Sequence, residues 1–542
     1  MQMPNDPNLA TIWEGVADAI PGQPALFHGD RTIAWGAFEN RAARLAQAFL
    51  DAGLGPGSKI AIDMYNCSQW LEAFFAGIKI RAVPTNVNYR YRDQELRHLL
   101  VDSHAEALLL HRSLAERMLP VAHSLGLKLI VEVEDEPGPV SPGTCAFEAL
   151  IDSHAPAARI ERSGEDQFLS YTGGTTGLPK GVMVRLGSAV NSVSFVGPML
   201  GLTPQMLPDH VGTARELAAR DARVSALPAS PLMHSTGFQM TALPALTYGG
   251  AVATLVSRSL DARELLAVVE RHRVRQVAIV GDAIGRPLVN ALREDAAAGR
   301  RYDLSCLKLI SSAGVAFTAE TKIGLFEFIP DVTLLDACGT SEGITYGFRA
   351  YRKGDPLSGT NFTPAPGLLL LDEQGNARPA TPGLTGIMAN TTGAAGYYND
   401  PEKTARTYRM LDGRWCAVPG DHGRIEADGT LTLLGRGSTT INTGGEKVHP
   451  EEVEDVIKGL TQVEDCLVIG LPDERWGQRV TAIVQPRAGA RLDAEAVIAH
   501  VRAQLAPYKA PKAVVTVARV PRAPNGKPDY RGAADLARQS RS

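Results

Sequence analysis

The chain has 542 residues, more than one hydrophobic core usually supports, so at least two domains are expected. Hydrophobic residues make up 44% and charged residues 21% of the chain, as in ordinary soluble globular proteins. The net charge is −4 and the sequence has no basic stripe, which argues against binding to nucleic acid.

The sequence contains no segment typical of export or membrane insertion. The N-terminal residues include acids and lack a basic region followed by an apolar stretch, so no signal peptide is expected. No run approaches the roughly 20 apolar residues of a membrane span. The six cysteines are scattered without metal-ligand spacing and are expected to be reduced thiols. We therefore expect a cytoplasmic enzyme.

Two periodicities alternate over the first 350 residues. Apolar residues recur at helical spacing over residues 38–49, where Gly53 is placed to end the helix, and again over 70–78 and 261–273. Short apolar runs predict strands at residues 59–64, 107–110, 129–131, 224–227, 251–255, 277–280, 307–310 and 332–335. Because strands alternate with helices, and the alternation restarts after residue 222, we predict an α/β fold with two stacked subdomains of parallel sheet covered by helices.

From about residue 355 the pattern changes to hairpins. Apolar segments turn at residues 372–375 and at Asp428-Gly429, and an Asp-Gly pair between alternating apolar residues favours a hairpin. We therefore predict a β-rich subdomain that completes a large domain of residues 1–436. Residues 437–542 are predicted to form a small α+β domain that ends in a Pro- and Lys-rich tail. Its short polar linker is expected to leave it mobile.

The strongest local motif is Tyr-Thr-Gly-Gly-Thr-Thr-Gly-Leu-Pro-Lys-Gly at residues 171–181. Its glycines let backbone amides approach phosphate oxygens, its hydroxyls add donors, and its lysine adds charge. The lysine spacing excludes a Walker A loop, and with it a motor-type P-loop NTPase. The alternative is a flexible surface loop. We interpret the motif as a phosphate-binding loop, whose candidate residues are Thr172, Gly173, Gly174, Thr175, Thr176, Gly177 and Lys180.

This motif resembles the phosphate loop of the adenylate-forming superfamily, which includes acyl-CoA synthetases, the adenylation domains of peptide synthetases, and luciferases. Gly173 stands where the superfamily usually has serine, and the rest of the loop matches. Further motifs of the superfamily follow in the same order over nearly the whole chain. The resemblance therefore implies that the protein activates a carboxylic acid by forming an acyl-adenylate.

Two further segments resemble the walls of the acyl site. Residues 231–237 resemble the Pro-x-x-His-x-x-Gly segment, whose histidine lies by the acyl pocket and the bound carboxylate in acyl-CoA synthetases. Outside this context a lone histidine is more often structural. Amino-acid-adenylating relatives tend to carry an aspartate here, and this chain has none. Residues 312–316, which include Gly314, resemble the loop that walls the adenine and the acyl pocket. The candidate acyl-site residues are His234, Met233, Phe238 and Val315.

Residues 336–343 follow a predicted strand and place hydroxyls and a carboxylate at its carboxyl end, where open α/β sheets bind ligands. The simpler alternative is a helix N-cap with an acid that favours the helix dipole. In the superfamily this segment contacts the α-phosphate and holds Mg²⁺, a role that the resemblance assigns to Glu342. Cys338 replaces the aromatic residue that usually stacks on adenine. The candidate nucleotide contacts are Gly339, Thr340 and Ser341.

Five residues near the predicted domain boundary extend the resemblance. Asp421 matches the aspartate that accepts hydrogen bonds from the ribose, and Arg436 can reach ribose or phosphate as a planar cation. Ser438 stands where relatives carry a hinge Asp or Lys, and a small polar residue can still absorb a backbone rotation. Gly444 and Gly445 match the glycines that let pantetheine pass during thioester formation.

Residues 521–527 resemble the C-terminal Pro-Arg-x-x-x-Gly-Lys motif. In the superfamily this lysine reaches into the large domain and stabilises charge between the carboxylate and the α-phosphate, although a lysine in a tail is ordinarily solvated. The resemblance thus implies a catalytic set of Lys527, Glu342 and Arg436.

The motifs together imply an ATP-dependent acyl-CoA ligase for a fatty or large alicyclic acid, with ATP, Mg²⁺ and CoA required. Three alternatives stay open: a carrier-protein thiol as acceptor, oxygen as acceptor, and a non-catalytic nucleotide-binding relative. The expected partners are the small-molecule acid, ATP and CoA. A homodimer is compatible with the sequence.

Overall fold

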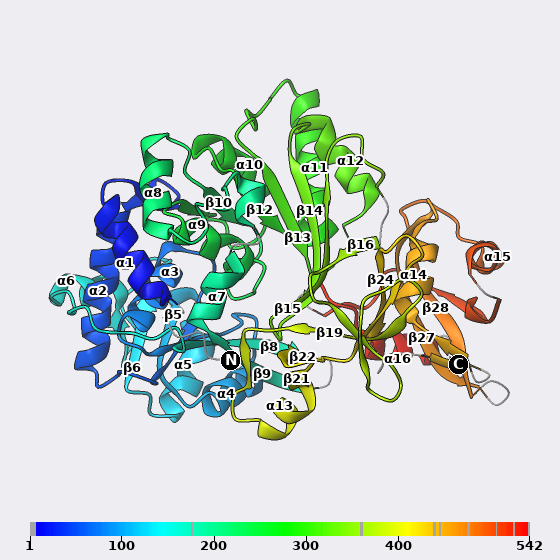
Figure 1. Cartoon of the computed structure of the whole chain (residues 1–542), viewed down its shortest axis with the longest axis horizontal. Helices are drawn as coiled ribbons and strands as arrows, with labels where there is room; N and C mark the ends of the chain where they lie inside the picture. The colour runs from blue at the N-terminus through cyan, green and yellow to red at the C-terminus, as the bar shows by residue number, and fades with distance from the viewer. Residues whose placement is uncertain are drawn as a thin grey trace.

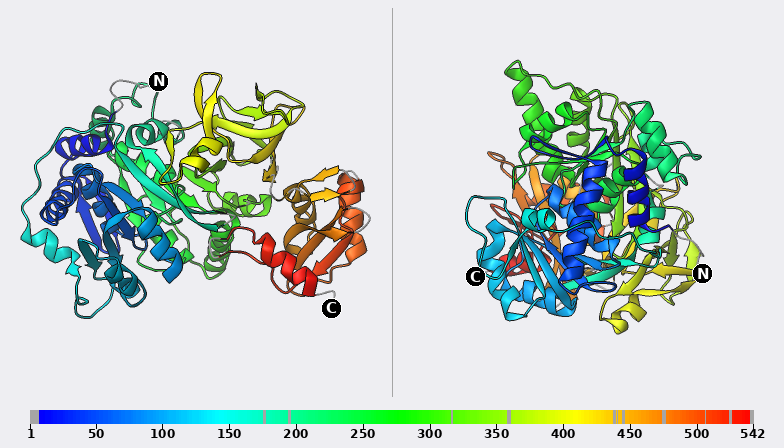
Figure 2. Two further views of the ribbon diagram at one scale, coloured as in Figure 1. Left: turned by 90° about the horizontal axis from the view of Figure 1, so that it is seen from below. Right: turned by 90° about the vertical axis from the view of Figure 1, so that its left-hand side faces the viewer.

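The computed structural model describes residues 7–174, 177–193, 196–315, 317–357, 361–436, 439, 441–443, 446–473, 477–505, 507–523 and 526–539. They form a large N-terminal domain and a small C-terminal domain, orange to red in Figure 1, that sits at one end of it (Figures 1 and 2). The predicted α/β fold with a large and a small domain is confirmed. The boundary at 436/437 stays a prediction, since residues 437, 438 and 440 lie outside the described ranges.

The first subdomain is a sheet with a parallel centre and helices on both faces. Its strand order is β20 (Ala394–Tyr397), β9 (Gly177–Arg185), β8 (Gln167–Gly174), β4 (Val83–Asn86), β3 (Lys59–Asp63), β5 (Ala105–His111), β6 (Leu129–Val133) and β7 (Cys145–Ala146). Strands β8 to β7 pair in parallel, whereas β9 and β20 are antiparallel.

The pleat of β3 explains why helices cover both faces of this sheet. Ile60 and Ile62 pack in one hydrophobic cluster and Ala61, between them, packs in another, because successive side chains of a strand point to opposite faces. The first cluster includes residues of α2 (Trp35–Asp51), α3 (Ser68–Lys79) and α6 (Phe147–Ser153). The second includes residues of α4 (Asp93–Asp102), η1 (Arg112–Leu114) and α5 (Ala115–Ser124).

The second subdomain is also a sheet with a parallel centre. Its strand order is β14 (Thr333–Thr340), β13 (Leu309–Ala313), β12 (Gln276–Ile279), β10 (Ser225–Pro228), β11 (Ala251–Thr254), β1 (Pro24–His28) and β2 (Arg31–Ala34). One face packs on α10 (Ala262–Arg271), α11 (Gly281–Ala297) and α12 (Ala319–Phe328). The remaining helices before the β-rich region are α1 (Leu9–Ala19), α7 (Leu186–Ser192), η3 (Gly197–Leu200), α8 (His210–Ala219), the π-helix η4 (Phe238–Ala242) and α9 (Leu243–Thr247).

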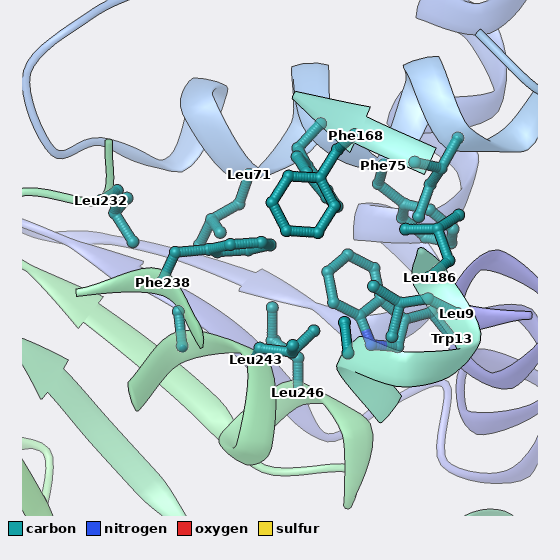
Figure 3. Close-up of a cluster of buried hydrophobic side chains, with 14 of the residues drawn as sticks. Leu9, Trp13, Leu71, Phe75, Phe168, Leu186, Leu232, Phe238, Leu243 and Leu246 are labelled. Atoms are coloured by element: carbon teal, nitrogen blue, oxygen red, sulfur yellow. The ribbon is translucent and has the colours of Figure 1, made fainter. Parts of the chain in front are cut away.

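The two subdomains share one hydrophobic core, which confirms that they are stacked. Trp13 of α1 makes an edge-on contact with Phe75 of α3, with ring centroids 5.1 Å apart. Phe238 of the second subdomain lies 4.5 Å from Phe74 and 5.9 Å from Phe168 of the first, centroid to centroid. Figure 3 shows Trp13, Phe75, Phe168 and Phe238 converging between elements from both subdomains. The sheets are therefore held in a defined relative orientation by a common apolar layer.

The β-rich subdomain continues the second sheet through β15 (Ile344–Tyr351), which pairs antiparallel with β14. Its other elements are β16 (Asn361–Pro364), β17 (Leu369–Leu371), β18 (Ala377–Pro379), β19 (Thr385–Thr391), α13 (Pro401–Thr407), β21 (Tyr408–Leu411), β22 (Arg414–Ala417), β23 (Asp421–Ile425) and β24 (Leu431–Arg436). The predicted hairpins are confirmed as β17–β18 and β23–β24.

The small domain has one sheet with helices on both faces. Its elements are β25 (Ile441–Thr443), β26 (Glu446–Val448), α14 (Pro450–Lys458), β27 (Val463–Asp473), β28 (Gly477–Pro486), α15 (Ala494–Gln504), η6 (Pro507–Lys509), β29 (Ala513–Thr516) and α16 (Tyr530–Gln539). Helices α14 and α15 pack on one face and α16 on the other. The prediction of a Pro- and Lys-rich tail missed α16, the helix that follows this segment at the end of the described chain.

Other details of the sequence prediction were also wrong. The sheets are mixed rather than parallel, because hairpin strands extend both of them. The β1–β2 hairpin belongs to the second sheet, where β1 pairs in parallel with β11. No helix begins after β14, so the helix N-cap interpretation of residues 341–342 fails. None of the helices in the described ranges is long and apolar enough to cross a lipid bilayer.

Candidate functional site

The predicted phosphate loop lies in the β8–β9 hairpin. Thr172 pairs with Lys180 across the two strands, and Gly174 pairs with Gly177. The backbone of Gly173 is described within β8, whereas Thr175 and Thr176 lie outside the described residues. The Nζ atom of Lys180 lies 3.1 Å from Oδ2 of Asp400. The strands thus hold a partly exposed lysine beside the tip of the hairpin.

Glu342 lies in the turn between β14 and β15. Its Oε1 accepts a hydrogen bond of 2.5 Å from the Tyr397 hydroxyl, and its backbone oxygen accepts one of 2.7 Å from Oγ1 of Thr392. Gly339 is required just before this turn, because a Cβ there would lie 2.5 Å from the backbone oxygen of Ile344. The Tyr397 hydroxyl therefore orients the Glu342 carboxylate, and Thr392 holds the backbone of the same residue.

Thr340 places a buried hydroxyl next to Glu342. Its Oγ1 is buried and has no hydrogen-bond partner among the described residues. A buried hydroxyl without a partner is costly, and it is explained when a ligand oxygen completes the bond. The neighbouring Ser341 and Gly343 form the turn, where Gly343 has a φ of +79°.

A second lysine, Lys403, lies near Lys180 and Glu342. Nζ of Lys403, on α13, lies 4.3 Å from the centroid of the Tyr397 ring. Burial and the nearby positive charge of Lys180 lower the pKa of Lys403 to about 8, against the opposing effect of Glu342. Two lysines held close enough to repel each other form a site that an anion would stabilise.

Asp421 begins β23, opposite Arg436 of β24. Its Oδ2 accepts a hydrogen bond of 2.7 Å from the Tyr346 hydroxyl. The backbone of Arg436 is described, but its side chain is not, so its predicted contact stays a prediction. The hydrogen bond fixes the Asp421 carboxylate on the same sheet that carries Cys338, whose Sγ donates to the Gly347 backbone oxygen at 3.3 Å.

His234 is one of the residues that line a narrow apolar cavity. Gly237 allows the chain to turn here, because a Cβ would lie 2.3 Å from the backbone oxygen of Pro231. Burial lowers the pKa of the His234 imidazole to about 4, and the positive charges of Lys527 and Arg90 add to this effect. The cavity lining includes Trp70, Phe74, Phe168, Met233, Phe238 and Gln239. The predicted lining residues Met233 and Phe238 are thus at the cavity.

Lys527 is carried to this site by a hairpin of the small domain. Arg522 donates to the backbone oxygen of Gly526 at 3.1 Å and binds Asp465 of β27 through two hydrogen bonds of 2.6 and 2.7 Å. The backbone of Gly526 faces the large domain, since a Cβ there would lie 3.9 Å from Cγ1 of Val315. The positive charge of Lys527 reaches His234, which lies in the large domain. The two domains therefore meet at one site.

The family model for "AMP-binding enzyme" matches residues 13–398, and that for "AMP-binding enzyme C-terminal domain" matches residues 452–527. The chain belongs to the AMP-binding enzymes.

Curated relatives match almost the whole chain of this AMP-binding enzyme. A medium/long-chain-fatty-acid–CoA/3-oxocholest-4-en-26-oate–CoA ligase of Mycolicibacterium smegmatis is 35% identical over 98% of this chain and 97% of its own. A 3-oxocholest-4-en-26-oate–CoA ligase of Rhodococcus rhodochrous is 36% identical over 97% of this chain and 95% of its own. The crystal structure of the anthranilate CoA ligase AuaEII in complex with anthranoyl-AMP superposes with a TM-score of 0.83. It covers 99% of this chain and 100% of its own at 24% identity, which shows the shared fold.

Several predicted residues of the AMP-binding enzyme come together, and others cannot be placed. Lys180 and Glu342 both lie close enough to Lys403 to change its pKa. Lys527 lies within electrostatic range of His234. Gly314 follows β13 with a φ of +97°, in the loop that brings Val315 to the small domain. Ser438, Gly444 and Gly445 lie outside the described residues, so their predicted roles stay untested.

Sequence reasoning missed the residues that orient the predicted ones. Tyr397, Thr392 and Lys403 surround Glu342, and Tyr346 holds Asp421. Tyr397 reaches Glu342 because β20 pairs with β9, next to the phosphate-loop hairpin. This strand pairing joins distant parts of the chain, and a single sequence carries no local signal for it.

Proposed function

We propose that this AMP-binding enzyme is an ATP-dependent acyl-CoA ligase. The observation that carries the proposal is the approach of Lys527, on the small domain, to His234 at the cavity of the large domain. A lysine there can stabilise negative charge that develops between a carboxylate and the α-phosphate of ATP. The names of the curated relatives, which are ligases of fatty and steroid acids with CoA, support the same reaction.

In the first step an oxygen of the substrate carboxylate attacks the α-phosphorus of ATP. The bond from that phosphorus to the bridging oxygen breaks, pyrophosphate leaves, and an acyl-adenylate remains. Catalysis of phosphoryl transfer consists mainly of positioning and charge stabilisation. We assign the phosphates to the 172–180 hairpin, the ribose to Asp421 and Arg436, and the reacting oxygens to Lys527.

We assign the Mg²⁺ that such reactions require to Glu342. Its carboxylate is oriented by Tyr397, and one carboxylate together with nucleotide phosphates suits this ion. Among the described residues no three His, Cys, Asp or Glu side chains gather into a metal cage, which fits an ion held largely by its nucleotide. When bound, Mg²⁺ would neutralise phosphate charge.

In the second step the CoA thiol attacks the acyl carbonyl carbon, the bond to the phosphate oxygen of AMP breaks, and the thiol loses its proton. We propose that the small domain first rotates about Ser438, so that Lys527 leaves and Gly444-Gly445 lies along the pantetheine. The two half-reactions then use one acyl site in turn, and the rotation can limit the turnover rate.

We propose a fatty or large alicyclic acid as the substrate. Trp70, Phe74, Phe168 and Phe238 give the cavity beside His234 an aromatic lining, which favours an apolar chain or ring over a polar acid. The curated relatives act, by their names, on medium- and long-chain fatty acids and on a steroid acid. We further propose a cytoplasmic enzyme, and we leave the choice between a monomer and a homodimer to gel filtration with light scattering.

The proposal is tested by measuring ATP–pyrophosphate exchange and CoA-dependent AMP release for a panel of acids that varies chain length and ring content. We expect exchange with apolar acids, and acyl-CoA formation when CoA is added. Exchange without acyl-CoA formation would indicate a carrier-protein thiol or another acceptor. An enzyme that binds ATP but shows no exchange with any acid would be a non-catalytic relative, and the proposal would fail.

A further inference from the structure

A chain of alternating charges bridges the two domains away from the catalytic residues. On the large domain, Arg286 of α11 donates to Asp282 at 3.0 Å and to Glu464 of β27 in the small domain. Glu464 also lies 3.7 Å from Nε of Arg487, in the small domain, and Arg487 donates at 3.0 Å to Glu320 of α12. We refer to Asp282, Arg286, Glu464, Arg487 and Glu320 as the interdomain ion-pair chain.

The large-domain end of this chain is tied to the loop that meets Lys527. Asp282 accepts hydrogen bonds from the backbone nitrogen and the hydroxyl of Thr318, at 3.0 and 2.8 Å. The backbone nitrogen of Gly281 donates to Oγ of Ser312 at 3.0 Å. Residues 312 and 318 flank the loop that contains Val315, the residue that faces Gly526.

The small-domain end is tied to Lys527 itself. Asp465, the residue after Glu464, holds Arg522 by two hydrogen bonds, and Arg522 holds the backbone oxygen of Gly526. The backbone nitrogen of Ala523 also donates to the backbone oxygen of Lys527 at 2.9 Å. Glu464 of β27 therefore binds α11, and the next residue, Asp465, binds the hairpin that presents Lys527.

From this geometry we infer that the interdomain ion-pair chain is a positioning device that holds the small domain where Lys527 meets His234. The inference rests on the proposed two-step ligase, because only an enzyme that reorients its small domain must form and break such a bridge. Arg286 and Glu464 touch no residue that we assign to a reacting group, so they act through the position of the small domain. The bridge favours adenylate formation and has to open before the CoA step.

The partly exposed position of these residues suits a bridge that opens. The exposed fractions are 32% for Arg286, 35% for Glu464 and 40% for Arg487. Partly exposed ion pairs are individually weak and are screened by salt, so this bridge can bias an equilibrium without locking it. A buried bridge of the same residues would oppose the second step.

The test compares Arg286→Gln, Glu464→Gln and the double variant with Arg293→Gln. Arg293 of α11 binds Glu327 of α12 at 3.0 Å, with exposed fractions of 47% and 46%, but both partners lie in the large domain. The first half-reaction is followed by ATP–pyrophosphate exchange. The second is followed by acyl-CoA formation from preformed acyl-adenylate and CoA in a single turnover. Thermal melting confirms that each variant is folded.

We expect each single bridge variant to slow adenylate formation about fivefold, the size expected for one ion pair of this exposure, with no loss in the CoA step. The double variant should lose no more than Glu464→Gln, because Glu464→Gln already removes the interaction with Arg286. Arg293→Gln should behave as the wild type. Raising the salt concentration should slow adenylate formation in the wild type more than in the double variant.

Two outcomes overturn the inference. In the first, Arg286→Gln and Arg293→Gln have the same exchange rate; in the second, both half-reactions of Arg286→Gln fall by the same factor. Either result, with an active wild type, contradicts the bridge and leaves the proposed ligase intact. A wild-type protein without exchange activity would contradict the proposed function instead.

Discussion

Lys527 of the small domain lies within electrostatic range of His234 of the large domain, and its charge adds to burial in lowering the pKa of the imidazole to about 4. The same hairpin places Gly526 against Val315. The described structure thus brings the small domain to the large one in the arrangement that we propose for the first half-reaction. The predictions below follow from this arrangement.

Replacing Lys527 by alanine should separate the two half-reactions. We expect adenylate formation to fall by a factor of about 100 or more, because a cation aimed at developing charge contributes strongly to catalysis. Acyl-CoA formation from preformed acyl-adenylate should stay within about twofold of the wild type, because Lys527 is withdrawn in that step. Exchange and single-turnover assays measure the two rates. The exposed Arg519, also in the small domain, is the control: Arg519→Ala should change neither rate.

A Lys527→Ala variant that loses both half-reactions equally would contradict the alternation of the small domain. It would also mean that His234 and Lys527 act together throughout the reaction. A variant that loses neither would remove Lys527 from the catalytic set.

The ionisation of His234 reports whether the two domains meet in solution. In Lys527→Ala the pKa of the imidazole should rise from about 4 toward its ordinary value of 6.5, because one of the charges that lower it is removed. NMR titration of the histidine ring measures this shift. Burial remains, so the pKa should not reach 6.5. An unchanged pKa in the variant would mean that Lys527 lies away from His234 in the free enzyme.

The same group makes the stability of the fold depend on pH. Between about pH 4 and pH 6.5 the unfolded chain holds a proton on this imidazole that the folded chain does not. Protons therefore favour the unfolded state in this range, and the free energy of unfolding decreases as the pH falls. Denaturant unfolding of the wild type and of His234→Asn should diverge in this window, with the smaller pH dependence in the variant.

Tyr397→Phe tests the orientation of Glu342. We expect adenylate formation to fall about tenfold and the Mg²⁺ concentration for half-maximal rate to rise, because a hydrogen bond to a charged group is lost. Tyr408→Phe is the matched control, since the Tyr408 hydroxyl is buried nearby without a hydrogen-bond partner among the described residues. Equal effects in the two variants would attribute the loss to packing rather than to Glu342.

Cys338→Tyr tests the adenine site. The superfamily that this chain resembles carries an aromatic residue at this position, and stacking on a base is favourable. Burial raises the pKa of the Cys338 thiol, so the residue acts as a neutral side chain in the wild type. We expect the KM for ATP to fall about fivefold while the KM for CoA is unchanged. An unchanged KM for ATP in a folded variant would place the adenine away from residue 338.

The parts of the site that the sequence predicted are those in which function depends on a short continuous segment. The apolar run before Asp336 predicted the strand, and the strand's end placed Glu342 at the carboxyl edge of the sheet, as observed. For Lys527, the resemblance of residues 521–527 to a superfamily motif implied a position near the large domain, and its charge acts on His234. In each case the residues that matter lie within a few positions of each other in the chain.

The missed parts depend on contacts between distant segments. Tyr397 is 55 residues from Glu342 in the chain and reaches it through the pairing of β20 with β9. The helix N-cap interpretation failed because β14 continues into β15 through a tight turn, where Gly343 has a φ of +79°. The bridge between Arg286 and Glu464 joins two surfaces that no local pattern connects. Tertiary packing, rather than local propensity, decides all three.

The strand pairings of the large domain have a consequence for its assembly during synthesis. The second sheet uses β1, made early, as the parallel neighbour of β11, and the first sheet is completed at one edge by β20, made late. Until β20 has emerged from the ribosome, the outer edge of the phosphate-loop strand β9 has no strand to pair with. The two α/β subdomains should therefore not fold independently one after the other. If they are expressed as two separate polypeptides, each fragment should aggregate.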